Sequence, residues 1–200
     1  MKEVLFPESA TEEEKKSLNL EISSSDDQTL GFKSDGNQPP KTKFAVRNIV
    51  LNEKGEIALV KSFKYGYTQI PGGGLEDGET IEEALRRETA EEIGYTVEIV
   101  KPLGYFRESR ESNLNKQSWT TAISFVYLSK ALENVGTNYM EYEIAEGFAP
   151  IWANLDEAIK DKEAELQKLL DNKSSYSGTF SSYRDLSILK FYQANPNQSS

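Results

Sequence analysis

The 200-residue sequence contains no cysteine and no histidine. Without cysteine the chain forms neither disulfides nor thiolate metal sites, and this fits a reducing compartment, so we expect a cytoplasmic protein. Without histidine it has no Ser/His/Asp triad, no Cys/His pair and no histidine-ligated zinc. Any acid–base or metal chemistry must therefore use carboxylates, lysine, tyrosine, arginine or water.

Long apolar runs are also lacking. No stretch approaches the roughly 18 to 20 residues that a membrane span needs. The start, "MKEVLFPESATEEEKK", does not have the basic and then apolar order of a secretory signal. The length suits one domain with a full core and an appendage. We therefore expect a soluble single-domain protein without a membrane partner.

Positive charge is in deficit. Lysine and arginine number 23 against 33 aspartates and glutamates, which gives a net charge of −10 and a pI of about 4.7. Such a chain does not attract nucleic acid or anionic membranes through its overall charge. An anionic small-molecule substrate would need a cation between itself and this protein.

Composition divides the chain into three parts. Residues 1–41 are polar and rich in turn formers, and they are predicted to be an N-terminal arm or small extra element with a short strand near Leu30 to Lys33. Residues 42–195 form the expected main domain, and residues 196–200 are expected to be a disordered tail. Whether the protein forms a homodimer is left open.

The apolar patterns of the main domain predict strands interspersed with helices. Asn52 to Gly55 is expected to be the turn of a β-hairpin. A helix should begin at Thr80, whose hydroxyl and Glu83 can form a capping box, and end at Gly94. Because strands flank the helices without strict alternation, an α+β fold with a mixed sheet is predicted. The remaining expected elements are strands at 43–51, 56–63, 67–70, 95–101, 104–109, 118–129 and 151–152, a loop at 133–150, and helices from about 154 and over 183–193.

The helix predicted after Thr80 has carboxylates where apolar residues should be. At about 100° per residue, the apolar stripe from Ile81 to Leu85 continues through Glu88 to Glu91 and Glu92, while Ile93 falls on roughly the opposite side. One reading is a solvated, glutamate-rich helix. The carboxylates are in phase with the buried stripe, and this favours a functional site over a solvated helix. Unpaired buried carboxylates are costly and repel one another, so something must compensate their charge.

The acidic face is therefore expected to border a wet cleft or to bind cations. Mg²⁺ or Mn²⁺ prefers such oxygen ligands, and Mg²⁺ commonly bridges carboxylates to substrate phosphates. Gly72 to Gly74 directly precede this helix, so a backbone carbonyl from the loop could complete a metal shell.

Residues 73–95, "GGLEDGETIEEALRRETAEEIGY", resemble the signature box of the Nudix hydrolases. That box is a Gly, five residues, a Glu, seven residues, and then Arg-Glu-x-x-Glu-Glu-x-Gly. Every polar and glycine position agrees, and the departures are Thr89 and Tyr95, where the family usually has aliphatic residues. The similarity extends from about residue 43 to 160, with a weaker match at 176–191.

The resemblance implies an α/β/α sandwich around a mixed sheet and hydrolysis of a nucleoside diphosphate linked to another group. It implies Mg²⁺ or Mn²⁺ as the cofactor. Glu79 and Arg87 would form an ion pair that orients the loop against the helix. The implied metal ligands are Glu88, Glu91, Glu92 and the carbonyl of Gly72.

The general base and the substrate contacts are open. Glu88 can act as the base, as can an acid from the loop before the last strand, where Glu146 is preferred to Glu141 and Glu143. The residues considered for contact with the nucleotide are Arg47, Lys61, Tyr65 and Tyr67.

Two further functions remain as alternatives to a small-molecule nucleotide pyrophosphohydrolase. One is a sensor module that binds a nucleotide without cleaving it, although such modules usually lose box carboxylates. The other is a hydrolase of RNA 5′ ends, which the acidic composition argues against.

Overall fold

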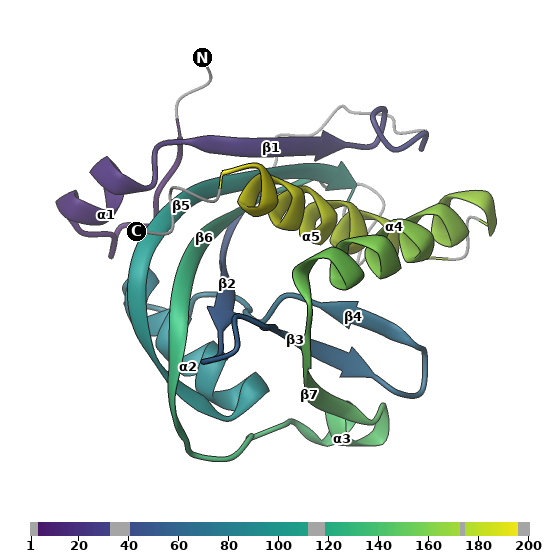
Figure 1. The fold of residues 1–200 in the computed structure, drawn as a ribbon. Coiled ribbons are helices and arrows are strands. Elements are labelled where there is room, and N and C mark those ends of the chain that lie inside the picture. The colour runs from purple at the N-terminus through teal and green to yellow at the C-terminus, as the bar shows by residue number, and fades with distance from the viewer. Residues whose placement is uncertain (1–3, 33–40, 112–118, 173–174, 196–200) are drawn as a thin grey trace.

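The structure is a computed structural model that describes residues 4–32, 41–111, 119–172 and 175–195 (Figure 1). Its seven-stranded sheet has the order β1-β5-β6-β2-β3-β4, with β7 also paired to β3. The strands are β1 Glu21–Asp26, β2 Lys41–Leu51, β3 Ile57–Ser62, β4 Tyr67–Gln69, β5 Tyr95–Glu111, β6 Trp119–Asn134 and β7 Phe148–Ala153. The helices are α1 Glu12–Ser17, α2 Ile81–Ile93, α3 Glu141–Ala145, α4 Leu155–Asn172 and α5 Tyr176–Ala194.

The sheet is mixed, as predicted. β1 pairs in parallel with β5, and β2 with β6, whereas the other pairings are antiparallel. In Figure 1 the long strands β5 and β6 curve, with α2 on one side and α4 and α5 on the other. The α+β class and the sandwich of helices around a mixed sheet are therefore confirmed.

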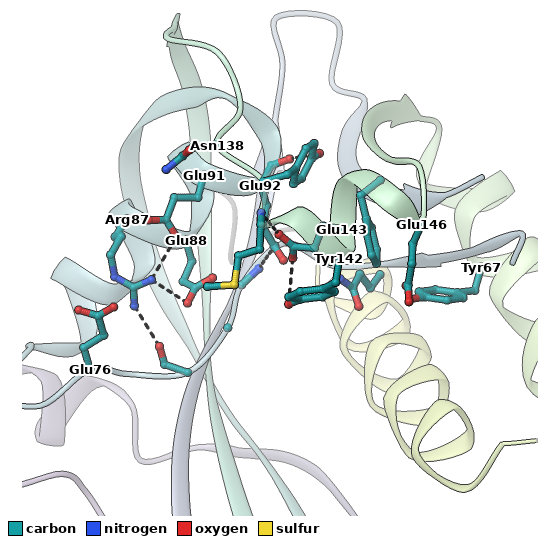
Figure 2. Close-up of a pocket in the computed structure, with 17 residues that line it drawn as sticks. Tyr67, Glu76, Arg87, Glu88, Glu91, Glu92, Asn138, Tyr142, Glu143 and Glu146 are labelled. Atoms are coloured by element: carbon teal, nitrogen blue, oxygen red, sulfur yellow. Dashed lines mark hydrogen bonds and ion pairs between the residues drawn. The ribbon is translucent and has the colours of Figure 1, made fainter. Parts of the chain in front are cut away.

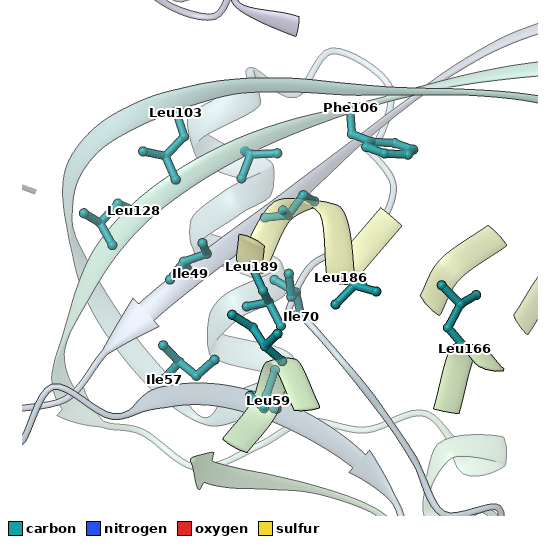
Figure 3. Packing of buried hydrophobic residues seen from close by; sticks show 14 residues of the cluster. Ile49, Ile57, Leu59, Ile70, Leu103, Phe106, Leu128, Leu166, Leu186 and Leu189 are labelled. Atoms are coloured by element: carbon teal, nitrogen blue, oxygen red, sulfur yellow. The ribbon is translucent and has the colours of Figure 1, made fainter. Parts of the chain in front are cut away.

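Alternating side chains of the strands pack on both faces of the sheet. On β6, Phe125 and Tyr127 pack in the cluster that contains the apolar side of α2. Val126 and Leu128 belong to the cluster formed with α4 and α5, in which Figure 3 labels Leu128. Because successive strand residues face opposite sides of a sheet, one strand fixes the position of both helical layers.

Strand β2 has an unusual partner on one edge. It pairs with β6 along its full length, but with β3 only through Leu51 and Ile57. The rest of that edge bonds to the glycine loop, since the Val46 N–H donates to the Gly73 carbonyl at 2.9 Å and the Asn48 N–H donates to that of Pro71 at 2.9 Å. The loop is thus held in place by the sheet, although its sequence is too glycine-rich to predict a strand.

Helix α2 begins and ends where the sequence predicts. Thr80 and Glu83 form a complete capping box, and Gly94 ends the helix in the left-handed conformation with φ 74°. The expected placement of Ile93 away from the buried side is wrong. Ile93 is buried with Val97 and residues of β2 and β3, because the sheet extends under the last turn of the helix as well.

Thr89, which replaces an expected aliphatic residue, has a buried polar partner. The Asn48 side-chain amide donates to the Thr89 hydroxyl at 2.9 Å, and the Ser129 hydroxyl donates to the Asn48 amide oxygen at 2.8 Å. All three residues are fully buried. A buried amide requires such partners, so the threonine hydroxyl links α2 to β2 and β6.

Three expected element boundaries in the second half of the chain are wrong. β5 is one strand and not two, because register shifts near Lys101 and Gly104 absorb the interruption. α3 lies within the expected loop, where the Glu143 carboxylate accepts from the Met140 N–H. α5 begins seven residues earlier than expected, at Tyr176, because Ser175 caps it.

The strand expected near Leu30 to Lys33 is also misplaced. The arm's strand is β1, and the chain turns directly after it. The Asp26 side chain accepts from the Thr29 N–H at 2.7 Å, and the Leu30 N–H donates to the Asp26 carbonyl. Lys33 and the expected tail at 196–200 lie outside the described residues. No described helix is long and apolar enough to cross a membrane.

Candidate active site

Two glycines of the loop are required for different reasons. A Cβ at Gly72, whose φ is +135°, would lie 2.2 Å from the Val46 carbonyl oxygen, so a side chain would push the loop off β2. A Cβ at Gly73 would lie within 2.5 Å of the Glu88 carboxylate. The first glycine therefore lets the loop approach the sheet, and the second lets a carboxylate approach the loop.

Arg87 joins the loop to the helix. Its Nε and Nη2 donate to the two carboxylate oxygens of Glu79 at 2.8 and 2.9 Å. Its Nη1 donates to Glu88 at 2.9 Å and to Glu91 at 3.3 Å, and Nη2 also donates to the Gly74 carbonyl at 3.0 Å. The hydrogen bonds with Glu79 raise the pKa of Arg87 and lower that of Glu79. One guanidinium thus fixes the loop and two box carboxylates together.

Glu92 is the most deeply buried of the three predicted carboxylate ligands, Glu88, Glu91 and Glu92, which are called the box carboxylates below. Its side chain accepts from the Gly72 N–H at 2.7 Å, and the residue is 8% exposed. Burial raises the pKa of Glu92 to about 8. Burial also raises the pKa of Glu88, against the opposing effect of Arg87. Both carboxyl groups are poorly compensated without a cation, which is the electrostatic condition expected of metal ligands.

The four loop residues Pro71 to Gly74 leave one backbone acceptor free in the described part of the chain. The carbonyls of Pro71 and Gly73 accept from β2, and that of Gly74 accepts from Arg87. Within the described part of the chain, the Gly72 carbonyl accepts no hydrogen bond. The predicted carbonyl ligand is therefore the one among these four that accepts no hydrogen bond.

These oxygens suit a hard divalent cation, for which carboxylates and carbonyls are the usual protein ligands. Across the described ranges, no three acidic side chains are already arranged to hold a metal ion. Glu91 retains freedom to move, since its side chain is 39% exposed and its contact with Arg87 is 3.3 Å. Binding of a cation would consequently draw the carboxylates together, and Glu91 has the most room to do so.

The box borders a cavity of about 580 Å³ (Figure 2). One wall consists of the glycine loop and α2, and the other consists of β4, α3 and the start of β7. Among the described residues that line it, six are glutamates and Arg87 alone is basic. The lining residues are Tyr67, Gln69, Gly72, Gly73, Gly74, Glu76, Arg87, Glu88, Glu91, Glu92, Asn138, Tyr139, Met140, Tyr142, Glu143, Glu146 and Phe148.

The predicted base and substrate residues are only partly brought together. Glu146 and Tyr67 lie beside each other on the wall opposite Glu88 (Figure 2). Lys61 is outside the described lining of the cavity, and its Nζ lies 5.3 Å from the centre of the Phe63 ring. Tyr67 therefore reaches the cleft, whereas the neighbouring lysine of the same hairpin does not.

Arg47 is half-buried on β2 and is not among the described residues that line the cavity. Its Nη1 donates to the carbonyl of Val46 at 2.6 Å, and its Nε has no partner in the described part of the chain. Burial lowers the pKa of Arg47 to about 10, assisted by Arg184 and opposed by Asp185 and Glu92. This guanidinium acts on the box carboxylates through its charge and does not line the cavity.

The sequence did not reveal most of the second wall. Asn138 donates its N–H to the Glu91 carbonyl at 2.8 Å, and the Tyr139 hydroxyl donates to the Glu92 carbonyl at 2.5 Å. These bonds attach the segment before α3 to the C-terminal end of α2. The segment "NYMEYEIAE" at 138–146 carries aromatic residues among its acidic ones, whereas the sequence predicts a role only for the acids of this expected loop, as candidate bases.

Glu92 makes the stability of the metal-free protein depend on pH. Because burial raises its pKa from 4.5 to about 8, the folded state keeps a proton that the unfolded state releases between these values. The free energy of unfolding should therefore decrease as the pH rises through this window, by up to about 1.4 kcal/mol per pH unit, and level off above it. Urea unfolding in the presence of a chelator measures this slope.

The matched variant is Glu92→Gln, which cannot release a proton. We expect its free energy of unfolding to change less between pH 5 and 8 than that of the unmodified chain. Identical slopes in the two proteins would show that the proton is held by another group.

The fold and the site define an α+β domain whose glycine loop and acidic helix present oxygen ligands to a cleft. Residues 41–172 match the NUDIX domain profile, and the chain belongs to the Nudix family. The family identification made from residues 73–95 is thus confirmed.

Similar proteins include the RNA pyrophosphohydrolase of Shewanella denitrificans, 44% identical over 55 residues, or 28% of this chain and 32% of that protein. The nucleoside triphosphatase NudI of Enterobacter sp. is 45% identical over 65 residues, or 32% of this chain and 45% of that protein. The chain thus spans less than half the length of these curated relatives.

Among solved structures, the chain is similar to a NUDIX hydrolase from Nitrosomonas europaea, with a TM-score of 0.48 and 21% identity over 62% of this chain and 79% of that one. It is also similar to the MutT protein from Methanosarcina mazei Go1, with a TM-score of 0.46 and 20% identity over 80% of this chain and 97% of that one.

Proposed function

We propose that this protein hydrolyses the pyrophosphate linkage of a nucleoside diphosphate derivative, nucleoside triphosphates included, with Mg²⁺ or Mn²⁺. The observation that carries the proposal is the grouping of the unused Gly72 carbonyl with Glu88, Glu91 and Glu92 at one wall of the cavity. A pyrophosphate cannot approach these carboxylates without a cation, since the described lining contains one basic residue and its guanidinium is already bound to Glu79.

Each box residue has a proposed role. Glu88, Glu91, Glu92 and the Gly72 carbonyl would hold the cation, which when bound neutralises phosphate oxygens and makes water a better nucleophile. Arg87 holds the loop and helix in register through its fork of hydrogen bonds to Glu79 and its contacts with Glu88 and Glu91.

Two carboxylates are candidates to accept the proton of the attacking water. Glu88 lies at the metal-binding wall, and its raised pKa favours proton acceptance. Glu146 lies on the opposite wall beside Tyr67. A base on either wall is consistent with the lining of the cavity, and the pH dependence of kcat in Glu146→Gln distinguishes them.

The second wall suits the nucleoside part of the substrate. The Tyr67 ring stacks on that of Tyr65, with centroids 6.3 Å apart and planes 9° apart, and meets that of Phe148 edge-on at 6.0 Å. Tyr142 is 59% exposed at the same wall. Such rings bind nucleobases by stacking, so the phosphates would lie at the acidic wall and the base at the aromatic wall. Contacts from Lys61 and Arg47 stay predictions.

Two alternatives have less support. One relative is named RNA pyrophosphohydrolase, but a cavity lined by six glutamates does not favour an RNA chain. A sensor module would not need all the box carboxylates that this chain retains.

We place the protein in the cytoplasm from its lack of cysteine, and homodimer formation stays a prediction.

The test is a panel of nucleoside triphosphates, oxidised ones included, nucleotide sugars, ADP-ribose, dinucleoside polyphosphates and 5′-triphosphorylated RNA. We expect phosphate, pyrophosphate or a nucleotide to be released from a small-molecule member with Mg²⁺ or Mn²⁺, and release to stop with a chelator. Tight nucleotide binding without release from any member would support the sensor, and turnover of RNA alone would support the second alternative.

A further inference from the structure

The N-terminal arm, residues 4–32, contacts the start of the box helix through a shared carboxylate. Glu14 is 4% exposed. One of its oxygens accepts from the Thr11 N–H at 2.7 Å and completes the capping box of α1. The other accepts from the Glu82 N–H, in the first turn of α2, at 3.0 Å across 68 positions of sequence. A single carboxylate therefore caps two helices, where the N-terminal dipoles favour a negative charge.

A second contact lies on the other side of Thr80. The Ser9 hydroxyl donates to the Glu79 carbonyl at 2.6 Å. Glu79 is the residue whose carboxylate holds Arg87. The arm thus fixes both the last loop residue before the helix cap and the first turn after it.

Packing keeps these two polar contacts in position. The Phe6 ring stacks on Phe125 with centroids 5.3 Å apart and planes 11° apart. Ala10 and Leu18 are buried in the cluster that contains the apolar residues of α2. The arm is consequently part of the core beneath the box helix.

The arm's other end is attached far from the box. The Tyr176 hydroxyl donates to one oxygen of Asp27, and the Glu111 N–H donates to the other at 3.3 Å. Asp27 is itself buried. The same arm therefore offers a buried carboxylate that anchors it without contacting the box, which makes a matched control.

We propose that Ser9 and Glu14 are positioning residues, through which the arm sets the start of α2 and thereby the orientation of Glu79, Arg87 and the metal-binding carboxylates. The arm lies outside the residues that match the family, 41–172. The contacts of Ser9 and Glu14 with the start of α2 therefore come from a part of the chain that the family match does not include. The effect on turnover rests on the proposed function, but the effects on the helix and on metal binding do not.

The experiment compares Glu14→Ala, Ser9→Ala, Ser9→Thr and the control Asp27→Asn in the full chain. Three quantities are measured: amide hydrogen exchange at residues 79–84, Mn²⁺ affinity by electron paramagnetic resonance, and kcat and KM for the best substrate of the panel.

For Glu14→Ala we expect amide exchange at residues 79–84 to accelerate about tenfold, Mn²⁺ to bind about tenfold more weakly and kcat to fall about tenfold. A tenfold change is the size expected when one buried hydrogen bond is lost. KM should stay within about twofold, because the arm does not touch the substrate cavity. Ser9→Ala should show smaller changes in the same direction, and Ser9→Thr, which keeps the hydroxyl, should restore them. Asp27→Asn should lower Tm and leave Mn²⁺ affinity unchanged.

Equal loss of Tm in Glu14→Ala and Asp27→Asn, with Mn²⁺ affinity unchanged in both, would overturn the proposal and leave the arm a purely structural attachment. If Glu14→Ala does not fold, the Ser9→Ala and Ser9→Thr pair decides, because it removes and restores one hydroxyl. If the unmodified chain turns over no substrate, the proposed function fails, while exchange and Mn²⁺ binding still decide the role of the arm.

Discussion

Replacing Glu88 with glutamine is expected to lower kcat by about a thousandfold, the scale on which loss of a metal-bound or proton-accepting carboxylate acts. The Glu88 side chain is 14% exposed between Arg87 and Gly73, and glutamine has the same shape and can still accept from Arg87. The substitution therefore removes the charge while leaving the packing in place. Initial rates at saturating Mn²⁺, together with Mn²⁺ affinity, measure the effect.

The control for this variant is Glu98→Gln, which removes one negative charge from an exposed position of β5. It should leave kcat within about twofold, since an exposed charge acts weakly through water. A Glu88→Gln protein that keeps more than a tenth of the activity would exclude Glu88 both as an essential ligand and as the base.

Arg87→Lys is expected to lower kcat by about a hundredfold and the free energy of unfolding by about 2 kcal/mol, because a lysine cannot reproduce a planar fork of charge-assisted hydrogen bonds. Arg87 bonds simultaneously to Glu79, Glu88, Glu91 and the Gly74 carbonyl. Lysine keeps the charge but contacts fewer of these groups, so the loop loses its fixed orientation. Urea unfolding and steady-state kinetics measure the two effects separately.

The adjacent Arg86 supplies the matched control. Among the described residues its side chain makes one hydrogen bond, from Nη1 to the Val97 carbonyl at 2.8 Å, and it is not part of the described lining of the cavity. Arg86→Lys should cost less than about 1 kcal/mol and leave kcat nearly unchanged. If Arg86→Lys and Arg87→Lys reduced kcat equally, the effect would come from the helix and not from the fork.

The part of the site that the sequence predicts is the part governed by local rules. Thr80 and Glu83 are three residues apart, so the capping box follows from spacing alone, and Gly94 ends the helix because it adopts a positive φ. The phase of Glu88, Glu91 and Glu92 follows from the helical period. These features need no knowledge of the rest of the fold.

The parts that the sequence did not predict depend on distant partners. Ile93 was placed on the wrong side because the helical period cannot show how far the sheet extends beneath the helix. The second cavity wall depends on β7 pairing with β3, and Phe148 pairs with Ser62, far earlier in the chain. Similarly, nothing near Glu14 indicates that it accepts from Glu82. Such contacts are set by tertiary structure, which local patterns do not contain.

The single residue pair between β2 and β3 has a consequence for how this cavity can evolve. The wall that contains the box carboxylates is attached to β2 through the glycine loop, whereas β4 and β7 of the opposite wall are both paired to β3. Substitutions in β4 and β7 can therefore accumulate with little disturbance to the glycine loop, whereas the bonds of Asn138 and Tyr139 to the Glu91 and Glu92 carbonyls attach the segment before α3 to α2. Under the proposed function, selection on β4 and β7 can change which nucleoside is accepted while the proposed hydrolytic chemistry is inherited unchanged.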